Sequence, residues 1–236
     1  MKYGTIYLIP NIIAEHTEKY VITEGVRRVL PNIVHFLAED IRTARRYLKT
    51  LSIYQAIEPL KFETLNKDTL KTDIKRLLQP ALDGHDLGIL SDSGCPGIAD
   101  PGAIAVAYAH EVGIKVIPLV GPSSILLALM ASGLNGQRFT FHGYLPIDTQ
   151  EAAKTIRDLE RESKQRNLTQ IFIETPYRSN SLFNTLIKNL GGRTLLSIAV
   201  DITSESEDIR TLSVSKWKNV SGELPKSPTV FSFLAI

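Results

Sequence analysis

The residues best suited to chemistry lie in a glycine-rich segment, Leu90-Ser-Asp-Ser-Gly-Cys-Pro-Gly-Ile-Ala-Asp-Pro-Gly102. The segment follows a short apolar run and precedes a helical pattern, which is where open α/β sheets bind ligands. Its glycines allow the backbone to approach a ligand closely. Gly97 and Gly102 have the spacing of a phosphate loop, but Ala103 and Ile104 stand where that loop needs Lys and Ser or Thr. An ATP or GTP loop is therefore excluded, and an ordinary connecting turn remains the alternative.

Two other turns place polar residues at predicted strand ends. In Pro118-Leu-Val-Gly-Pro-Ser-Ser124, the serines present hydroxyl and N–H groups at a helix start, although a simple helix cap has the same pattern. Together with the glycine-rich segment, this turn favours a shared pocket. In Ile171-Phe-Ile-Glu-Thr-Pro-Tyr-Arg178, the charges of Glu174 and Arg178 either face a substrate or form an ordinary surface pair.

Four cations, Arg42, Arg45, Arg46 and Lys49, recur at the spacing of one helix face. Such a face can bind RNA phosphates, although a solvated helix surface has the same pattern. The five histidines have no ligand-like spacing with each other or with Cys95, so no metal site is predicted. No evident base accompanies Cys95, which argues against a cysteine nucleophile.

The elements that must position these residues alternate along the chain, which predicts an α/β protein with a largely parallel sheet. Strands are expected at 4–9, 35–39, 87–90, 115–120, 170–174, 195–202 and 229–236, with an antiparallel strand at 209–214. Helices are expected at 24–30, 41–51, 68–82, 102–112, 122–132, 151–166 and 179–190. An aromatic segment ending at Pro146 suggests a first lobe of residues 1–145 and a smaller second lobe of 146–236.

The composition is that of a globular protein, with 43% hydrophobic and 22% charged residues among 236. A net charge of +2 is too small to indicate nucleic-acid binding by itself. We expect no membrane span, because no apolar stretch approaches the roughly 20 residues that one needs. The single cysteine cannot form an internal disulfide, which fits a cytoplasmic protein.

Taken together, the motifs resemble those of the tetrapyrrole-methylase superfamily. The resemblance is carried by Ser91–Gly102, Gly121–Ser124, Arg138–Pro146 and Glu174–Arg178, in that order. Gly4–Pro10 and Ala38–Arg46 further resemble the branch that methylates a ribose 2′-hydroxyl in bacterial small-subunit ribosomal RNA. The resemblance implies two αβα lobes, S-adenosylmethionine held in a cleft between them, and a homodimer.

The resemblance also implies site residues. Those lining the cofactor pocket would be Asp92, Cys95, Ile98, Ser123, Ser124 and Thr175, with Leu8, Ala199 and Thr229 placed by strand ends. The chain departs from the ribosomal branch on the substrate side: Asn11-Ile-Ile-Ala-Glu15 replaces Thr-Pro-Ile-Gly-Asn, and Val200-Asp-Ile-Thr-Ser204 replaces Arg-Glu-Leu-Thr-Lys. Glu174-Thr-Pro-Tyr-Arg178 likewise replaces Glu-Ala-Pro-His-Arg. These departures leave the exact RNA target open.

In methyl transfer from a sulfonium, the cofactor already carries the activated methyl group. The protein mainly positions the reactants and excludes water. A ribose hydroxyl must lose its proton, which Glu174 or Asp201 could accept, while Arg178 could steady the oxyanion or a phosphate. Three functions remain open from the sequence. They are an RNA 2′-O-methyltransferase acting on ribosomal RNA or the small subunit, a methylase of a corrin, porphyrin or other small molecule, and a non-catalytic RNA-binding protein.

Overall fold

The computed structural model describes residues 2–236, which form two compact units divided between Ser123 and Ser124. The boundary expected after residue 145 therefore lies within the second unit. The reason is that the helix Ser124–Ser132 (α7) and the strand Phe139–Phe141 (β6) both pack with the second sheet. The proline that ends the aromatic segment marks a loop inside this unit.

The first unit contains a five-stranded, all-parallel sheet in the order β3-β2-β4-β1-β5. Its strands are β1 (Thr5–Ile9), β2 (His35–Ala38), β3 (Lys61–Thr64), β4 (Leu87–Leu90) and β5 (Lys115–Pro118). Leu90 is in register with both Ile9 and Ala38, so β1, β2 and β4 end at the same level. The loops after these strands consequently leave from one edge of the sheet.

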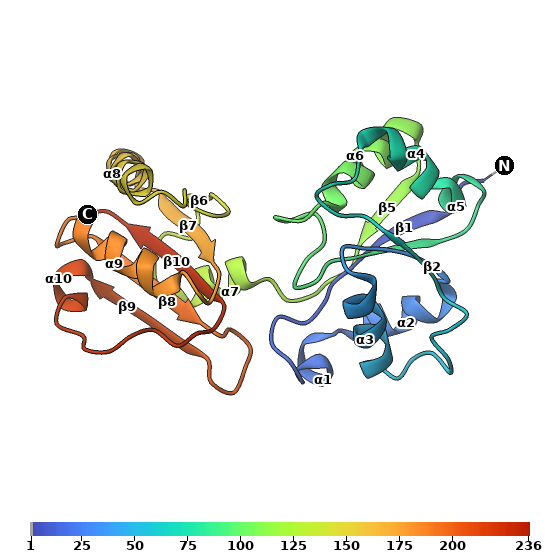
Figure 1. The fold of residues 1–236 in the computed structure, drawn as a ribbon, viewed down its shortest axis with the longest axis horizontal. Coiled ribbons are helices and arrows are strands. Elements are labelled where there is room, and N and C mark those ends of the chain that lie inside the picture. Colours follow the sequence, from blue (N-terminus) through green and yellow to red (C-terminus); the bar gives the residue numbers. More distant parts are fainter. Residues whose placement is uncertain (1) are drawn as a thin grey trace. The chain divides into compact units, whose positions relative to one another are not determined.

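Helices cover both faces of this sheet (Figure 1). One face carries α1 (Glu18–Val21), α2 (Glu24–Val29), the 3₁₀ turn Leu30–Asn32 and α3 (Ile41–Thr50). The other face carries the 3₁₀ turn Lys71–Asp73, α4 (Ile74–Leu77), α5 (Gln79–Leu82) and α6 (Gly102–Val112). Alternate strand residues supply the two cores, as Phe36 packs toward the α3 face and Leu37 toward the α6 face.

The single helix predicted at 68–82 is wrong, because the structure breaks it into three short pieces. Leu78, between α4 and α5, has ψ near 4° and leaves the helical region. Pro80 explains the break, since it has no N–H to continue the hydrogen-bond ladder and prefers the first turn of a new helix.

The second unit has a mixed five-stranded sheet in the order β6-β7-β10-β8-β9. The strands after β6 are β7 (Thr169–Glu174), β8 (Leu195–Val200), β9 (Asp208–Ser213) and β10 (Thr229–Leu234). Only β6 and β7 pair in parallel, so the expected parallel arrangement holds for the first sheet alone. The antiparallel strand predicted at 209–214 is confirmed as β9.

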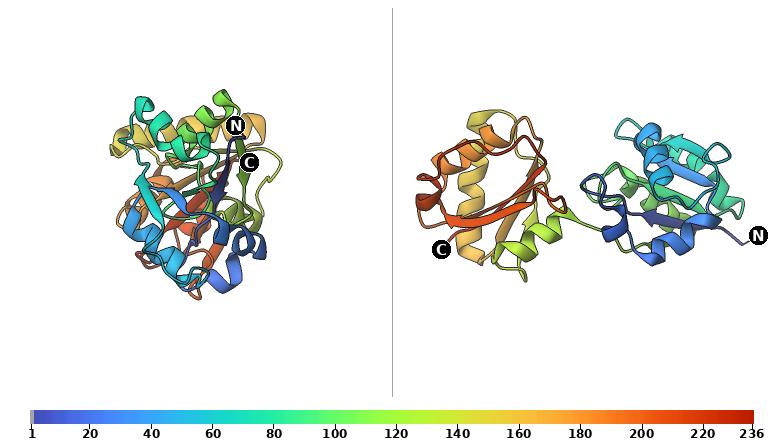
Figure 2. Two further views of the ribbon diagram at one scale, coloured as in Figure 1. Left: turned by 90° about the vertical axis from the view of Figure 1, so that its right-hand side faces the viewer. Right: turned by 90° about the horizontal axis from the view of Figure 1, so that it is seen from below.

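Helices again cover both faces of the second sheet (Figure 2). The helices α8 (Thr149–Arg166), α9 (Ser179–Asn189) and α10 (Val214–Trp217) share one core with Phe172, Phe231 and Phe233. On the opposite face α7 packs through Ala128 and Leu129. No helix within residues 2–236 is long and apolar enough to cross a membrane.

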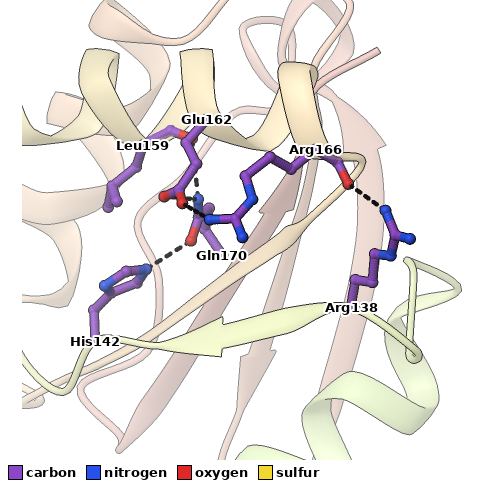
Figure 3. A network of polar contacts seen from close by, with 6 residues as sticks. All are labelled: Arg138, His142, Leu159, Glu162, Arg166 and Gln170. Carbon is purple, nitrogen blue, oxygen red and sulfur yellow. Dashed lines mark hydrogen bonds and ion pairs between the residues drawn. The ribbon is translucent and has the colours of Figure 1, made fainter.

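A polar network fastens β6 and α8 to β7 (Figure 3). The fully buried Gln170 amide oxygen lies 2.6 Å from His142 Nε2, and its amide nitrogen donates to the Leu159 carbonyl (3.1 Å) and to Glu162 (3.3 Å). Glu162 in turn pairs with Arg166 at 2.8 Å. The network therefore satisfies a polar side chain inside an otherwise apolar core.

Candidate functional site

The loops after β1, β4 and β5 are tied together at one edge of the first sheet, and Asn11 makes most of the ties. Its side-chain nitrogen donates to the carbonyl oxygens of Ser91 and Asp92, each at 3.0 Å, and its side-chain oxygen accepts from Ile12 N–H at 2.8 Å. Its backbone N–H donates to Gly94 O at 2.8 Å. Asn11 is buried, so these bonds hold the loop at Asp92 in a fixed position.

The glycine-rich loop closes on itself through Asp100. One carboxylate oxygen of Asp100 accepts from the N–H groups of Gly97 and Gly102, at 2.8 and 2.7 Å. Gly97 has φ of +83°, a conformation that side chains rarely adopt. Asp100, Pro101 and Gly102, at the end of the loop, therefore have a structural role. They close the turn and lead into α6.

The turn after β5 packs closely on the other two loops. A Cβ added to Gly121 would lie 2.1 Å from Pro10 Cβ, so only glycine allows this approach. Cys95 Sγ lies 3.3 Å from Pro122 O, which joins the glycine-rich loop to the turn before Ser123. The structure therefore brings together the parts of the first unit that hold Asp92, Cys95 and Ser123. Ile98 is exposed in the same loop, and Leu8 is partly buried in β1.

Carboxylates surround this edge of the sheet and raise each other's pKa. The pKa of Asp92 is raised by partial desolvation and by the nearby charges of Asp40 and Asp100. The pKa of Glu39 is raised by burial and by Asp92 and Asp100. Negative charge is therefore concentrated where it is poorly compensated, and a cationic ligand would relieve it. Burial also raises the pKa of the Cys95 thiol, which keeps it protonated and unsuited to nucleophilic attack.

In the second unit, the predicted residues also gather at one edge of the sheet. Thr229 is in register with both Glu174 and Val200, so the end of β7, the start of β10 and the end of β8 lie side by side. Asp201 directly follows Val200. Ala199 belongs to the core under α7, whereas strand alternation places Thr229 and Glu174 on the α9 face.

Glu174 and Arg178 form an ion pair, which the sequence left as one of two alternatives. Glu174 Oε2 lies 3.0 Å from Arg178 Nη2, and the Glu174 side chain is fully buried. Glu174 Oε1 accepts from the Thr175 N–H at 2.7 Å. Among residues 2–236, Oε2 has no hydrogen bond of good geometry, and the Arg178 guanidinium is its electrostatic partner. This arrangement orients Arg178, whose side chain stays one-third exposed.

Asp201 lies in a tight turn after β8. Its φ is +54° and that of Thr203 is +74°, both uncommon for residues other than glycine. The Asp201 carboxylate accepts from Ser206 Oγ at 2.5 Å. The turn thus holds a carboxylate in a defined position at the end of a central strand.

The cations predicted to bind RNA lie on α3, which Asp40 caps by accepting from Thr43 N–H at 2.6 Å. All are exposed, but they do not form a single row. The Arg45 guanidinium lies over the Phe62 ring, 5.1 Å from its centre. Arg46 instead lines a pocket of about 460 Å³ that α3 forms with the β1 and β4 loops.

Sequence reasoning missed Asn11, Asp100 and this pocket. For Asn11 the available signal is an asparagine that follows a predicted strand and its terminal proline, because asparagine side chains commonly hydrogen-bond within turns. Grouping the residues of α3 by charge does not reveal the pocket. Thr43, Arg46, Tyr47 and Thr50 have equally regular helical spacing and form its wall.

No family model matches the chain. The chain is 31% identical over 205 residues to ribosomal RNA small subunit methyltransferase I of Halalkalibacterium halodurans, covering 87% of this chain and 66% of that protein. It is 30% identical over 220 residues to the protein of the same name in Bacillus subtilis, covering 92% and 70%. The fold is similar to that of the methyltransferase CobJ, with a TM-score of 0.62 over the full length of both chains and 14% identity.

Proposed function

Because the chain belongs to the ribosomal RNA small subunit methyltransferase I family, we propose that it methylates a ribose 2′-hydroxyl of small-subunit ribosomal RNA with S-adenosylmethionine as donor. Membership makes the chain a methyltransferase, while the donor, the RNA and the methylated atom are the proposed part. The observation that carries the proposal is the acidic loop edge of the first unit, where Asn11 fixes the loop that holds Asp92. A cytoplasmic homodimer is part of the same proposal.

The chemistry of this edge fits a sulfonium donor. S-Adenosylmethionine has a cationic sulfur and an ammonium group, which the carboxylates of Glu39, Asp92 and Asp100 would attract. The bound donor supplies an activated methyl group, so neither a metal nor a covalent protein intermediate is needed. The residues proposed to hold it are Leu8, Asp92, Cys95, Ile98, Ser123, Ser124, Thr175, Ala199 and Thr229.

The charged residues of the second unit are proposed to serve the acceptor hydroxyl. Glu174 holds the partly exposed Arg178 by an ion pair, which suits Arg178 for steadying an oxyanion or a phosphate. Of the two carboxylates suggested by the sequence, Asp201 would accept the proton of the hydroxyl, because the Glu174 side chain is fully buried against Arg178. Substitution of each residue should lower turnover more than donor affinity. Full turnover in Glu174→Gln, Arg178→Ala and Asp201→Asn would refute these roles.

The proposal is tested by methyl transfer from labelled donor to small ribosomal subunits lacking the modification. We expect label in the ribosomal RNA, at a nucleotide that resists alkaline hydrolysis because its 2′-oxygen is blocked. Label in a corrin or porphyrin offered in parallel, with none in RNA, would instead identify a small-molecule methylase. Binding of ribosomal RNA without methyl transfer to either substrate would indicate a non-catalytic RNA-binding protein. Sedimentation of the purified chain tests the dimer.

A further inference from the structure

The pocket beside α3 lies at a position where α/β sheets bind ligands. It is lined by the loop after β1, the start of α1, one face of α3, and Asp92 and Ser93 of the loop after β4, all within the first unit. The strands β2 and β4 are neighbours, and their connections run in opposite directions, to β3 and to β5. Such a switch point leaves a crevice beyond the strand ends. A volume of about 460 Å³ is in the range of small-ligand pockets.

The walls of the pocket combine a rigid apolar surface with hydroxyl groups. Tyr47 is buried and its hydroxyl donates to Pro10 O at 2.7 Å, so its ring is fixed as part of the wall. Ile12 and Ile13 add apolar surface from the β1 loop, and Thr43 and Thr50 add hydroxyls from α3. A flat ring with polar edges suits such a surface.

The pocket also holds charged side chains of both signs. Within residues 2–236, the side chains of Arg46, Glu15 and Glu18 make no ion pair or hydrogen bond, although all three line the pocket. Asp92 is a further carboxylate at its wall. A bare phosphate would be repelled by three carboxylates, and a simple cation would be repelled by Arg46. The ligand should therefore have both an anionic group and hydrogen-bond donors.

We propose that this pocket binds one nucleotide of the RNA substrate, whose base has an exocyclic amino group. Arg46 binds the phosphate, the carboxylates of Glu15 and Glu18 accept hydrogen bonds from the amino group, and the base lies against Tyr47. The exposed cations Arg42, Arg45 and Lys49 continue along α3 outside the pocket and suit neighbouring phosphates of a polymer. Uracil has no amino group and is disfavoured. The inference rests on the proposed function.

The test measures binding of fluorescent RNA hexamers A₆, C₆ and U₆ to the full chain, without methyl donor. We expect A₆ and C₆ to bind about tenfold more tightly than U₆, because uracil lacks the amino group that the two carboxylates would bind. The double variant Glu15→Ala/Glu18→Ala should lose this preference without losing U₆ binding. Arg46→Ala should weaken all three by a similar factor. Glu58→Ala and Lys19→Ala, exposed charges outside the pocket, serve as controls and should match the wild type.

Equal binding of the three hexamers by the wild type would overturn the inference, as would a preference that survives in the double variant. Calorimetry with S-adenosylmethionine gives a separate readout. If the double variant loses donor affinity but keeps the hexamer preference, the pocket holds the donor and the inference is wrong. Failure to bind any hexamer, or small ribosomal subunits, would refute the RNA substrate itself. That outcome differs from equal binding, which refutes only the assignment of this pocket.

Discussion

At the scale of single residues, Asn11 should contribute to both stability and donor binding, although it belongs to no catalytic motif. Asn11→Ala leaves two carbonyl oxygens and one N–H group without their partner, and we expect a loss of about 2–3 kcal/mol in unfolding free energy. Donor affinity should also fall, because the loop at Asp92 is released. Urea unfolding and calorimetry measure the two effects. Asn32→Ala, an exposed control, should stay within about 0.5 kcal/mol. An unchanged donor affinity in Asn11→Ala would refute the positioning role.

The raised pKa of Asp92 predicts opposite effects on stability and on binding. A carboxyl whose pKa is higher in the folded state binds its proton more tightly there, so its charge costs stability once the pH is above that pKa. Asp92→Asn should therefore be at least as stable as the wild type at pH 7, with the difference vanishing as the pH falls toward the unfolded value of about 4. The same variant should bind the cationic donor more weakly. A variant that is less stable at every pH would show that the carboxylate is structural.

At the scale of elements, the contact between the loops after β1 and β5 can be tested by comparing two glycine substitutions, one at the contact and one away from it. Gly121→Ala places a methyl group on Pro10 and should cost about 1–3 kcal/mol, with weaker donor binding because the loops move apart. A Cβ at Gly136 meets no atom of the described residues within 4 Å, so Gly136→Ala should be tolerated. Thermal unfolding and donor titration of both variants test the contact. Equal behaviour of the two would mean that the loops move at little cost.

The network at Gln170 gives a pH-dependent prediction for the second unit. Gln170→Glu places a buried carboxyl beside Glu162 and the Leu159 carbonyl, which raises its pKa in the folded state. Stability should therefore be lost as the pH rises through that pKa. The deficit relative to wild type should grow between pH 5 and pH 8 in thermal unfolding. Gln150→Glu, exposed in the first turn of α8, should show no such trend. A deficit independent of pH would indicate lost packing alone.

Local patterns predicted most elements because apolar periodicity and caps are local signals. The helix Gly102–Val112 and the strand Leu87–Leu90 have the expected bounds. The strand Lys61–Thr64 escaped prediction because it is short, charged and mostly exposed at the sheet edge. The antiparallel order of the second sheet depends on pairing between distant segments, such as Thr229 with Glu174, which no local pattern encodes.

In the candidate sites, too, some features follow from local sequence and others depend on contacts between distant segments. The loop at Asp92 was predictable, since its glycines and its place between strand and helix are visible in the sequence. The hydrogen bonds between the loops were not predictable, because Asn11 and Asp92 meet only when β1 and β4 become neighbours in the sheet. The pocket beside α3 likewise needs three separate segments of the first unit. Composition could not indicate it.

At the scale of the whole molecule, the charge balance predicts how RNA binding depends on salt. With 27 basic and 25 acidic residues the overall field is weak, so attraction to RNA must come from local cations such as those of α3. Each phosphate that a cation neutralises on single-stranded RNA contributes about −0.7 to the slope of log affinity against log salt. If Arg42, Arg45, Arg46 and Lys49 each contact a phosphate, the slope should be about −3. Arg42→Ala and Lys49→Ala should each reduce its magnitude by about 0.7, whereas Lys19→Ala should not. A slope unchanged by both substitutions would place the RNA on another face of the protein.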